Sequence, residues 1–67
     1  MVKSKTILII EDESLLSEAY AMILKKEGFD TLEAHNGLEA LEIIARHKVD
    51  LILLDLRMPK MNGIEFL

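Results

Sequence analysis

The sequence DLILLDLRMPKMNG at residues 50–63 places a short aliphatic run directly before an aspartate, Asp55. A second aliphatic run near the start of the chain, at residues 6–10, leads in the same way into Glu11 and Asp12. Both runs are too short for helices and are typical of strands that are covered on both faces. If the two strands are parallel, their carboxylates emerge at the same edge of one sheet, where open α/β folds bind their ligands.

The composition is typical of a small globular domain. The chain has 67 residues, 51% of them hydrophobic, and it contains no cysteine that could form a disulfide. A chain of this size buries only about 60% of the surface that it exposes when unfolded, so we expect a bound cation or a partner chain to add stability. The net charge of -4 disfavours direct binding to nucleic-acid phosphates. No apolar run is long enough for a membrane helix and no signal-peptide pattern is present, so we expect a cytoplasmic location without membrane contact.

Strand and helix patterns alternate along the chain. We expect strands at residues 7–10, 29–35 and 51–54, the second of them a polar edge strand, and helices at residues 15–27 and 38–48. Right-handed crossovers between these strands would give a parallel sheet. The buried stripe of the first helix is predicted from its three- and four-residue spacing to contain Leu16, Ala19, Tyr20, Ile23 and Leu24.

The ends of the helices carry recognisable signals. Ser14 is a candidate cap for the first helix and Gly28 a candidate stop. Asn36 and Glu39 have the spacing of a capping box at the start of the second helix. The same Asn-Gly-apolar-Glu pattern returns at residues 62–65 and predicts the start of a third helix at Asn62.

Glu11, Asp12 and Asp55 would lie within a few ångströms of one another if the first and third strands are neighbours. Acids this close repel, so either one or more keeps its proton or a hard cation such as Mg²⁺ is bound among them. Glu11 and Asp12 have a second explanation, because acids at a helix start favour its positive end. For Asp55, between aliphatic residues, a structural purpose is not apparent, and a functional role is favoured.

Three blocks of the sequence together resemble the phosphoacceptor receiver domain of two-component response regulators. They are ILIIEDE at residues 7–13, NGLEAL at residues 36–41 and DLILLDLRMPKMNG at residues 50–63. The third block is the most specific. The resemblance implies an α/β fold of the flavodoxin-like receiver type, with a parallel sheet of order 2-1-3 built as βαβαβ and followed by the start of a third helix. It also implies that residues 1–67 form one unit, a partial receiver domain.

The same resemblance implies roles for individual residues. Asp55 looks like the phosphorylated aspartate, while Glu11 and Asp12 look like the acidic pair that serves Mg²⁺, together with Asp55 and the backbone carbonyl of Arg57. Glu11 stands where the family often has Asp. The implied donor is the phosphohistidine of a sensor histidine kinase, which makes the chain a phosphoacceptor and not an enzyme. The family's further strands, which supply a Ser or Thr and a Lys to the phosphoryl group, are not matched here, so we expect slow phosphorylation.

A second function, from another class, stays open at this point. The chain could be a structural or interaction module, a half-domain that self-associates and lacks working phosphotransfer. The aliphatic edge at residues 51–54, together with Phe66 and Leu67, predicts a homodimer or larger assembly through the edge of the third strand. A dehalogenase-type phosphatase would need an Asp where Arg57 stands, and a dinucleotide site would need a Gly-rich turn after the first strand, so we reject both.

Overall fold

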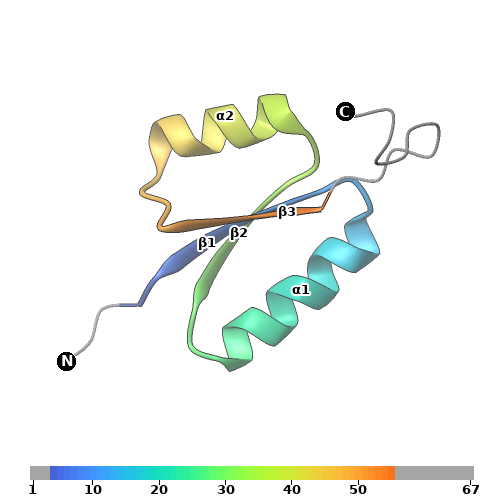
Figure 1. The fold of residues 1–67 in the computed structure, drawn as a ribbon, viewed down its shortest axis with the longest axis vertical. Helices are drawn as coiled ribbons and strands as arrows, with labels where there is room; N and C mark the ends of the chain where they lie inside the picture. The colour runs from blue at the N-terminus through green and yellow to red at the C-terminus, as the bar shows by residue number, and fades with distance from the viewer. Residues whose placement is uncertain (1–3, 56–67) are drawn as a thin grey trace, which may run out of the picture.

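The computed structural model of the protein describes residues 4–55. Its elements follow the order β1 (Thr6–Glu11), α1 (Ser14–Lys26), β2 (Asp30–Ala34), α2 (Gly37–Arg46) and β3 (Leu51–Asp55). The strands form one parallel sheet of order β2-β1-β3 (Figure 1), which confirms the predicted fold and the polar edge position of the second strand. The expected third helix at Asn62 lies outside the described residues.

The two helices cover opposite faces of the sheet, α2 on one and α1 on the other (Figure 1). Successive side chains of β1 alternate between these faces, because a strand has a period of two residues. Leu8 and Ile10 pack toward α2, in a cluster with Ala34 and Ala40. On the opposite face, Ile7, Ile9 and Ala21 form the cluster beneath α1. Strand β1 is therefore buried on both sides, as its continuous aliphatic sequence predicts.

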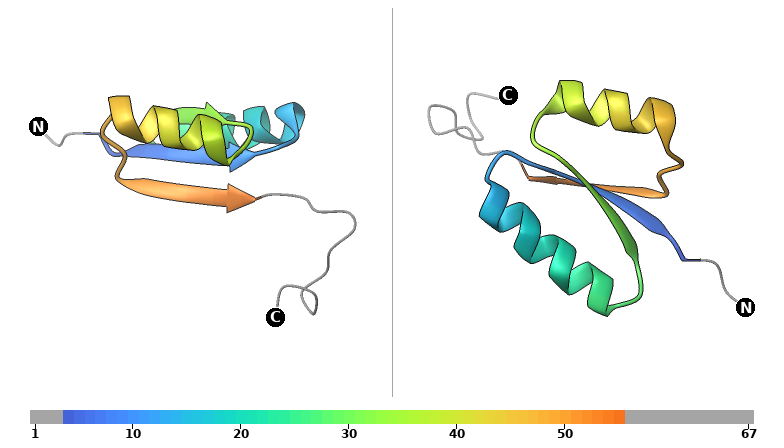
Figure 2. Two further views of the ribbon diagram at one scale, coloured as in Figure 1. Left: turned by 90° about the horizontal axis from the view of Figure 1, so that it is seen from above. Right: turned by 180° about the vertical axis from the view of Figure 1, so that it is seen from behind.

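Strand β3 lies at one side of the sheet, beyond the part that the two helices cover (Figure 2). Both helices pack mainly on β1 and β2, so Leu51, Ile52 and Leu54 remain 60%, 47% and 63% exposed. The start of β3 is tied to β1 by Asp50, whose Oδ2 accepts a 2.8 Å hydrogen bond from the Thr6 backbone N–H. The backbone N–H of Asp50 donates in turn to the Thr6 carbonyl at 2.9 Å. These two bonds fix the register that brings the strand ends together.

The first helix begins one residue earlier than the sequence pattern predicts, and the prediction of Ser14 as its cap is wrong. Ser14 is already helical, and the capping position belongs to Glu13, whose side chain makes no capping bond. The end of α1 agrees with the prediction, because Gly28 adopts a φ of 96°. This left-handed conformation is open to glycine without the steric cost that a Cβ imposes.

The predicted buried stripe of α1 is correct only in part. Leu16, Tyr20 and Leu24 are half-buried, whereas Ala19 is exposed and Ile23 is 60% exposed. Ser17 and Ala21 take the most buried positions instead. The reason for the buried polar residue is its partner, since the Ser17 hydroxyl donates a 2.6 Å hydrogen bond to Glu33 Oε1 on β2. A hydrogen-bonded hydroxyl can be buried without leaving a polar group unsatisfied.

The start of α2 confirms the predicted cap. Asn36 Oδ1 accepts a hydrogen bond from the Glu39 backbone N–H at 2.8 Å. The Glu39 carboxylate reaches back to the backbone N–H of His35, also at 2.8 Å, one residue before the cap. The helix ends at Arg46, two residues short of the predicted end, and the N–H of His47 closes the last turn on the Ile43 carbonyl.

Candidate functional site

The candidate site lies at the carboxyl edge of the sheet, where β1 and β3 end. Glu11 and Asp55 are register partners on these adjacent strands, and Asp12 follows Glu11 directly. The structure thus brings together the ends of the two aliphatic runs, because parallel neighbours present their carboxyl ends at one edge. Arg57, whose carbonyl the resemblance adds to this set, lies outside the described residues.

Glu11 is fully buried, although it is a carboxylic acid at a strand end. One oxygen, Oε2, accepts a 2.9 Å hydrogen bond from the backbone N–H of Glu13. The other oxygen, Oε1, is buried and has no hydrogen-bond partner in the part of the chain that the structure describes. An unsatisfied buried oxygen is costly, so this position calls for a proton or a cation.

The surroundings of Glu11 act on its protonation. Burial raises the pKa of the Glu11 carboxyl above its ordinary value, while the hydrogen bond from Glu13 N–H acts in the opposite direction. Asp55 and Asp12 each raise the pKa of Glu11 further, because a proton shared between neighbouring carboxyls relieves their repulsion. The arrangement therefore favours a counter-charge at the strand ends.

The donor set matches a hard divalent cation in its chemistry. Carboxylate oxygens are the ligands that Mg²⁺ prefers, and the unpartnered Glu11 Oε1 is an oxygen without another role among residues 4–55. Within these same residues, no group of three or more His, Asp or Glu side chains is arranged to hold a metal ion as it stands. Asp12, next to Glu11 in the chain, has an exposed side chain that also acts on the pKa of Glu11.

Tyr20 is a member of the site that the sequence pattern did not reveal. Its hydroxyl donates a 2.6 Å hydrogen bond to Asp55 Oδ2. The helical spacing indicated only that Tyr20 belongs to the buried stripe of its helix, and its ring does pack against the cluster of Ile7, Ile9 and Ala21. The contact with Asp55 depends on how α1 crosses the sheet toward β3, which helical periodicity does not describe.

A second group of polar side chains joins the starts of the two helices beside this edge. His35 Nδ1 lies 3.2 Å from Glu39 Oε1, and His35 Nε2 lies 3.4 Å from the hydroxyl of Ser14. The hydrogen bond from the backbone N–H of His35 is the main factor that holds the pKa of Glu39 below its ordinary value. All three side chains are exposed. The group links β2, α1 and α2 and so supports the loops next to the acids.

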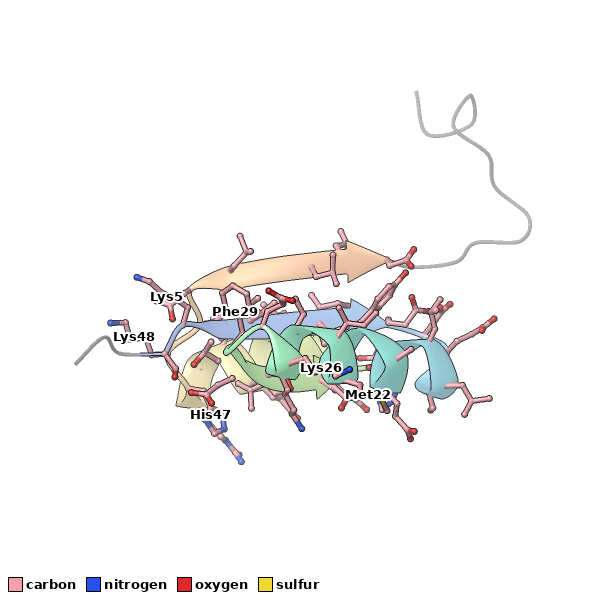
Figure 3. The ribbon with its side chains drawn as sticks, turned by 90° about the horizontal axis from the view of Figure 1, so that it is seen from below. Lys5, Met22, Lys26, Phe29, His47 and Lys48 are labelled. Atoms are coloured by element: carbon pink, nitrogen blue, oxygen red, sulfur yellow. The ribbon has the colours of Figure 1, made fainter. Side chains whose placement is uncertain are left out.

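Two hollows of the described chain lie away from the acids. A pocket of about 410 Å³ at the amino ends of the strands is lined in part by Lys5 and Lys48, which lie together at that end in Figure 3. A second pocket, of about 300 Å³, lies between α2 and β3 and is lined by Ile44, Val49, Asp50, Leu51 and Ile52.

Among residues 4–55 no helix is long and apolar enough to cross a membrane.

Known proteins are similar to this chain in both sequence and fold. The family model of the response regulator receiver domain matches residues 7–67. The polar-differentiation response regulator DivK of Brucella anthropi is 36% identical over 61 residues, which cover 91% of this chain and 50% of that protein. The sporulation initiation phosphotransferase F of Bacillus subtilis is 41% identical over 64 residues, covering 96% of this chain and 52% of its own length.

Solved structures agree with these relatives. A response regulator receiver protein from Pseudomonas putida superimposes with a TM-score of 0.79 at 27% identity, over 97% of this chain and 55% of that one. FixJ-N gives a TM-score of 0.72 at 26% identity, over 96% of this chain and 51% of its own. The chain thus spans about half the length of the curated relatives it matches. It belongs to the response regulator receiver domain family of two-component signalling proteins.

Proposed function

We propose that the chain is a phosphoacceptor, in which Asp55 accepts a phosphoryl group from a phosphohistidine of a sensor histidine kinase. The observation that carries the proposal is the pairing of Asp55 with Glu11 at the ends of adjacent strands, in a chain of the receiver family. Asp55 is half-buried, whereas Glu11 is fully buried. A donor can therefore approach Asp55, while Glu11 lies beside it on the adjacent strand.

Receiver domains generally bind Mg²⁺ at the phosphorylation site, and here Glu11, Asp12 and Asp55 would hold the ion with the carbonyl of Arg57. Bound there, the ion supplies positive charge that offsets the repulsion between the carboxylate and the phosphoryl oxygens. Glu11 contributes a buried oxygen with no partner among the described residues. Asp12, exposed directly after Glu11, would contribute a second carboxylate.

The transfer step itself places little demand on the rest of the described chain. A carboxylate oxygen of Asp55 forms a bond to phosphorus as the bond from phosphorus to the imidazole nitrogen of the donor breaks. The electron pair of the broken bond stays on that nitrogen. Positioning and charge, not general acid or base chemistry, therefore govern the rate. In this role the chain is a substrate of the transfer and at most phosphorylates itself from a small donor.

The proposal is tested by phosphorylation with a small acyl phosphate in the presence of Mg²⁺. Borohydride reduction followed by peptide mass spectrometry then locates the modified residue. We expect a slow reaction, with the label on Asp55 in the parent and none in Asp55→Asn. Asp30→Asn is the matched control, because Asp30 is an exposed aspartate at the opposite end of the sheet. A label on another acid would overturn the assignment of Asp55.

The exposed edge of β3 favours a second candidate function, as an interaction module. In the described sheet β3 pairs only with β1, and Leu51, Ile52 and Leu54 leave its surface apolar. An unpaired apolar strand edge invites pairing with another chain. A second copy is the simplest partner, because a two-fold contact between β3 strands closes on itself. In this function residues 1–67 act as one unit that self-associates with or without phosphotransfer. Phe66 and Leu67, also expected at this contact, lie outside the described residues.

A further inference from the structure

The hydrogen bond between Tyr20 and Asp55 joins two elements that otherwise make little contact. Tyr20 lies on α1, which packs on β1 and β2, whereas Asp55 ends β3. The aromatic ring packs against the apolar cluster of Ile7, Ile9 and Ala21, and Leu53 of β3 packs against the same cluster. The hydroxyl is thereby directed at Asp55 Oδ2, at 2.6 Å. The ring is anchored and only its polar tip reaches the carboxylate.

The hydrogen bond between Tyr20 and Asp55 has the length of a charge-assisted hydrogen bond. A distance of 2.6 Å is typical of a hydroxyl that donates to an ionised carboxylate, and such bonds are roughly twice as strong as those between neutral groups. Its strength depends on the negative charge of the acceptor. When the carboxylate becomes an acyl phosphate, one oxygen is bonded to phosphorus and the other is a neutral carbonyl oxygen. Either oxygen is then a weaker acceptor for the phenol.

We propose that Tyr20 is a positioning residue that restrains Asp55 before phosphorylation and releases it when the phosphoryl group is attached. The inference rests on the proposed role of Asp55 as phosphoacceptor and adds a residue, Tyr20, that regulates how fast Asp55 reacts. The phenol keeps its proton throughout: the only bonds that change are the new bond from Asp55 to phosphorus and the broken bond from phosphorus to the donor. Tyr20 loses a hydrogen-bond acceptor, not a proton.

This arrangement has a kinetic consequence. An interaction that is stronger in the ground state than in the transition state slows the reaction. Removal of the hydroxyl in Tyr20→Phe should therefore speed phosphorylation of Asp55 by a small acyl phosphate. We expect an increase of about three- to tenfold, since a hydrogen bond to a charged group is only partly lost in the transition state. Circular dichroism would check that the variant keeps its fold.

Tyrosine fluorescence gives a readout that a merely structural role would not change. Tyr20 is the only tyrosine of the sequence, and there is no tryptophan. A carboxylate that accepts from a phenol quenches its fluorescence, because the excited phenol transfers its proton readily. Beryllofluoride, which attaches to an aspartate as a phosphoryl mimic, should therefore raise the emission of the parent. Asp55→Asn should be brighter than the parent before any addition.

The matched control moves the tyrosine without changing the composition of aromatic rings. In the double variant Tyr20→Phe, Phe29→Tyr the single tyrosine packs against the same cluster but at the start of β2, at the opposite end of the sheet (Figure 3). Its emission should not respond to beryllofluoride.

The outcomes separate the two proposals. Faster labelling of Tyr20→Phe, with a rise in emission of the parent but not of the double variant, would support the role of Tyr20. Labelling of the parent with no gain in Tyr20→Phe, or no change in parent emission, would overturn that role and leave Asp55 as the acceptor. Absence of label and of beryllofluoride attachment at Asp55 in the parent would overturn both. If Tyr20→Phe does not fold, the comparison of the parent with Asp55→Asn decides, and equal emission of the two refutes the restraint.

Discussion

Glu11 and Asp55 are register partners at the ends of β1 and β3, but only Asp55 is accessible to solvent. The difference arises because β1 is the central strand, with α1 and α2 on its two faces, whereas β3 lies at the edge of the described sheet. In the proposed function, a buried carboxylate beside an accessible one would give the pair two different roles. The accessible carboxylate could react, and the buried one could help to hold a cation next to it.

We predict that the protein binds Mg²⁺ through these acids. Asp55→Asn and Asp12→Asn should each weaken binding by roughly tenfold, because each removes one negative charge from the ligand set. Isothermal titration with Mg²⁺ measures this directly. Glu27→Gln, at the exposed end of α1, is the control with one charge fewer and an intact site. Equal affinities in the parent and both Asn variants would show that the ion, if bound, lies elsewhere.

The raised pKa of Glu11 predicts how stability depends on pH when no Mg²⁺ is added. A folded-state pKa above the unfolded one means that the folded state binds more protons between these two values. The free energy of unfolding therefore falls as pH rises from the ordinary glutamate pKa through the raised one.

Glu11→Gln should remove this fall and be more stable than the parent at neutral pH, because a neutral amide replaces a buried charge and can still accept from Glu13 N–H. Urea unfolding at several pH values tests the expectation. Added Mg²⁺ should stabilise the parent more than the variant. A parent that is the more stable of the two at neutral pH without Mg²⁺ would contradict the prediction.

The start of α2 gives a prediction of opposite sign. The pKa of Glu39 is lowered chiefly by the hydrogen bond from His35 N–H, so its contribution to stability is complete above the ordinary glutamate pKa. It is lost as pH falls through the lowered pKa. Glu39→Gln should reduce this acid-side loss, and Glu42→Gln, exposed on the same helix, should leave it unchanged. Thermal unfolding measured from neutral pH down to below the lowered pKa of Glu39 compares the variants.

The cap of the same helix gives a separate prediction. Asn36→Ala should lower the free energy of unfolding by about 1 kcal/mol at every pH measured, because it removes the hydrogen bond from the Glu39 backbone N–H.

The exposed edge of β3 predicts self-association. Sedimentation at micromolar concentration should show the parent as a dimer or larger species, and Ile52→Lys should shift it to monomer or unfold it, since a charge on this edge opposes pairing. Met22→Lys is the control, because Met22 is 67% exposed on α1, away from the edge of β3 (Figure 3). A folded, monomeric parent would rule out the proposed contact.

The order of elements and the position of the acids followed from local sequence. Continuous aliphatic runs marked β1 and β3 as strands, and each run ended in the acid that now stands at the sheet edge, Glu11 or Asp55. The expectation that both strands are covered on both faces holds only for β1, because among the described residues both helices pack mainly on β1 and β2. The cap at Asn36 and the stop at Gly28 were equally predictable, because capping bonds and a left-handed turn involve residues only a few positions apart.

Tertiary structure decided what depends on contacts between distant elements. The rotation of α1 about its axis places Ser17 in the interior, where it bonds to Glu33, and leaves Ile23 facing solvent. The same packing carries the Tyr20 hydroxyl to Asp55, 35 residues further along the chain. Helical periodicity indicates which residues share a face, but the neighbours of that face depend on how the helix crosses the sheet. For this reason the sequence by itself identified the acids of the site, and only the fold showed that Tyr20 touches one of them.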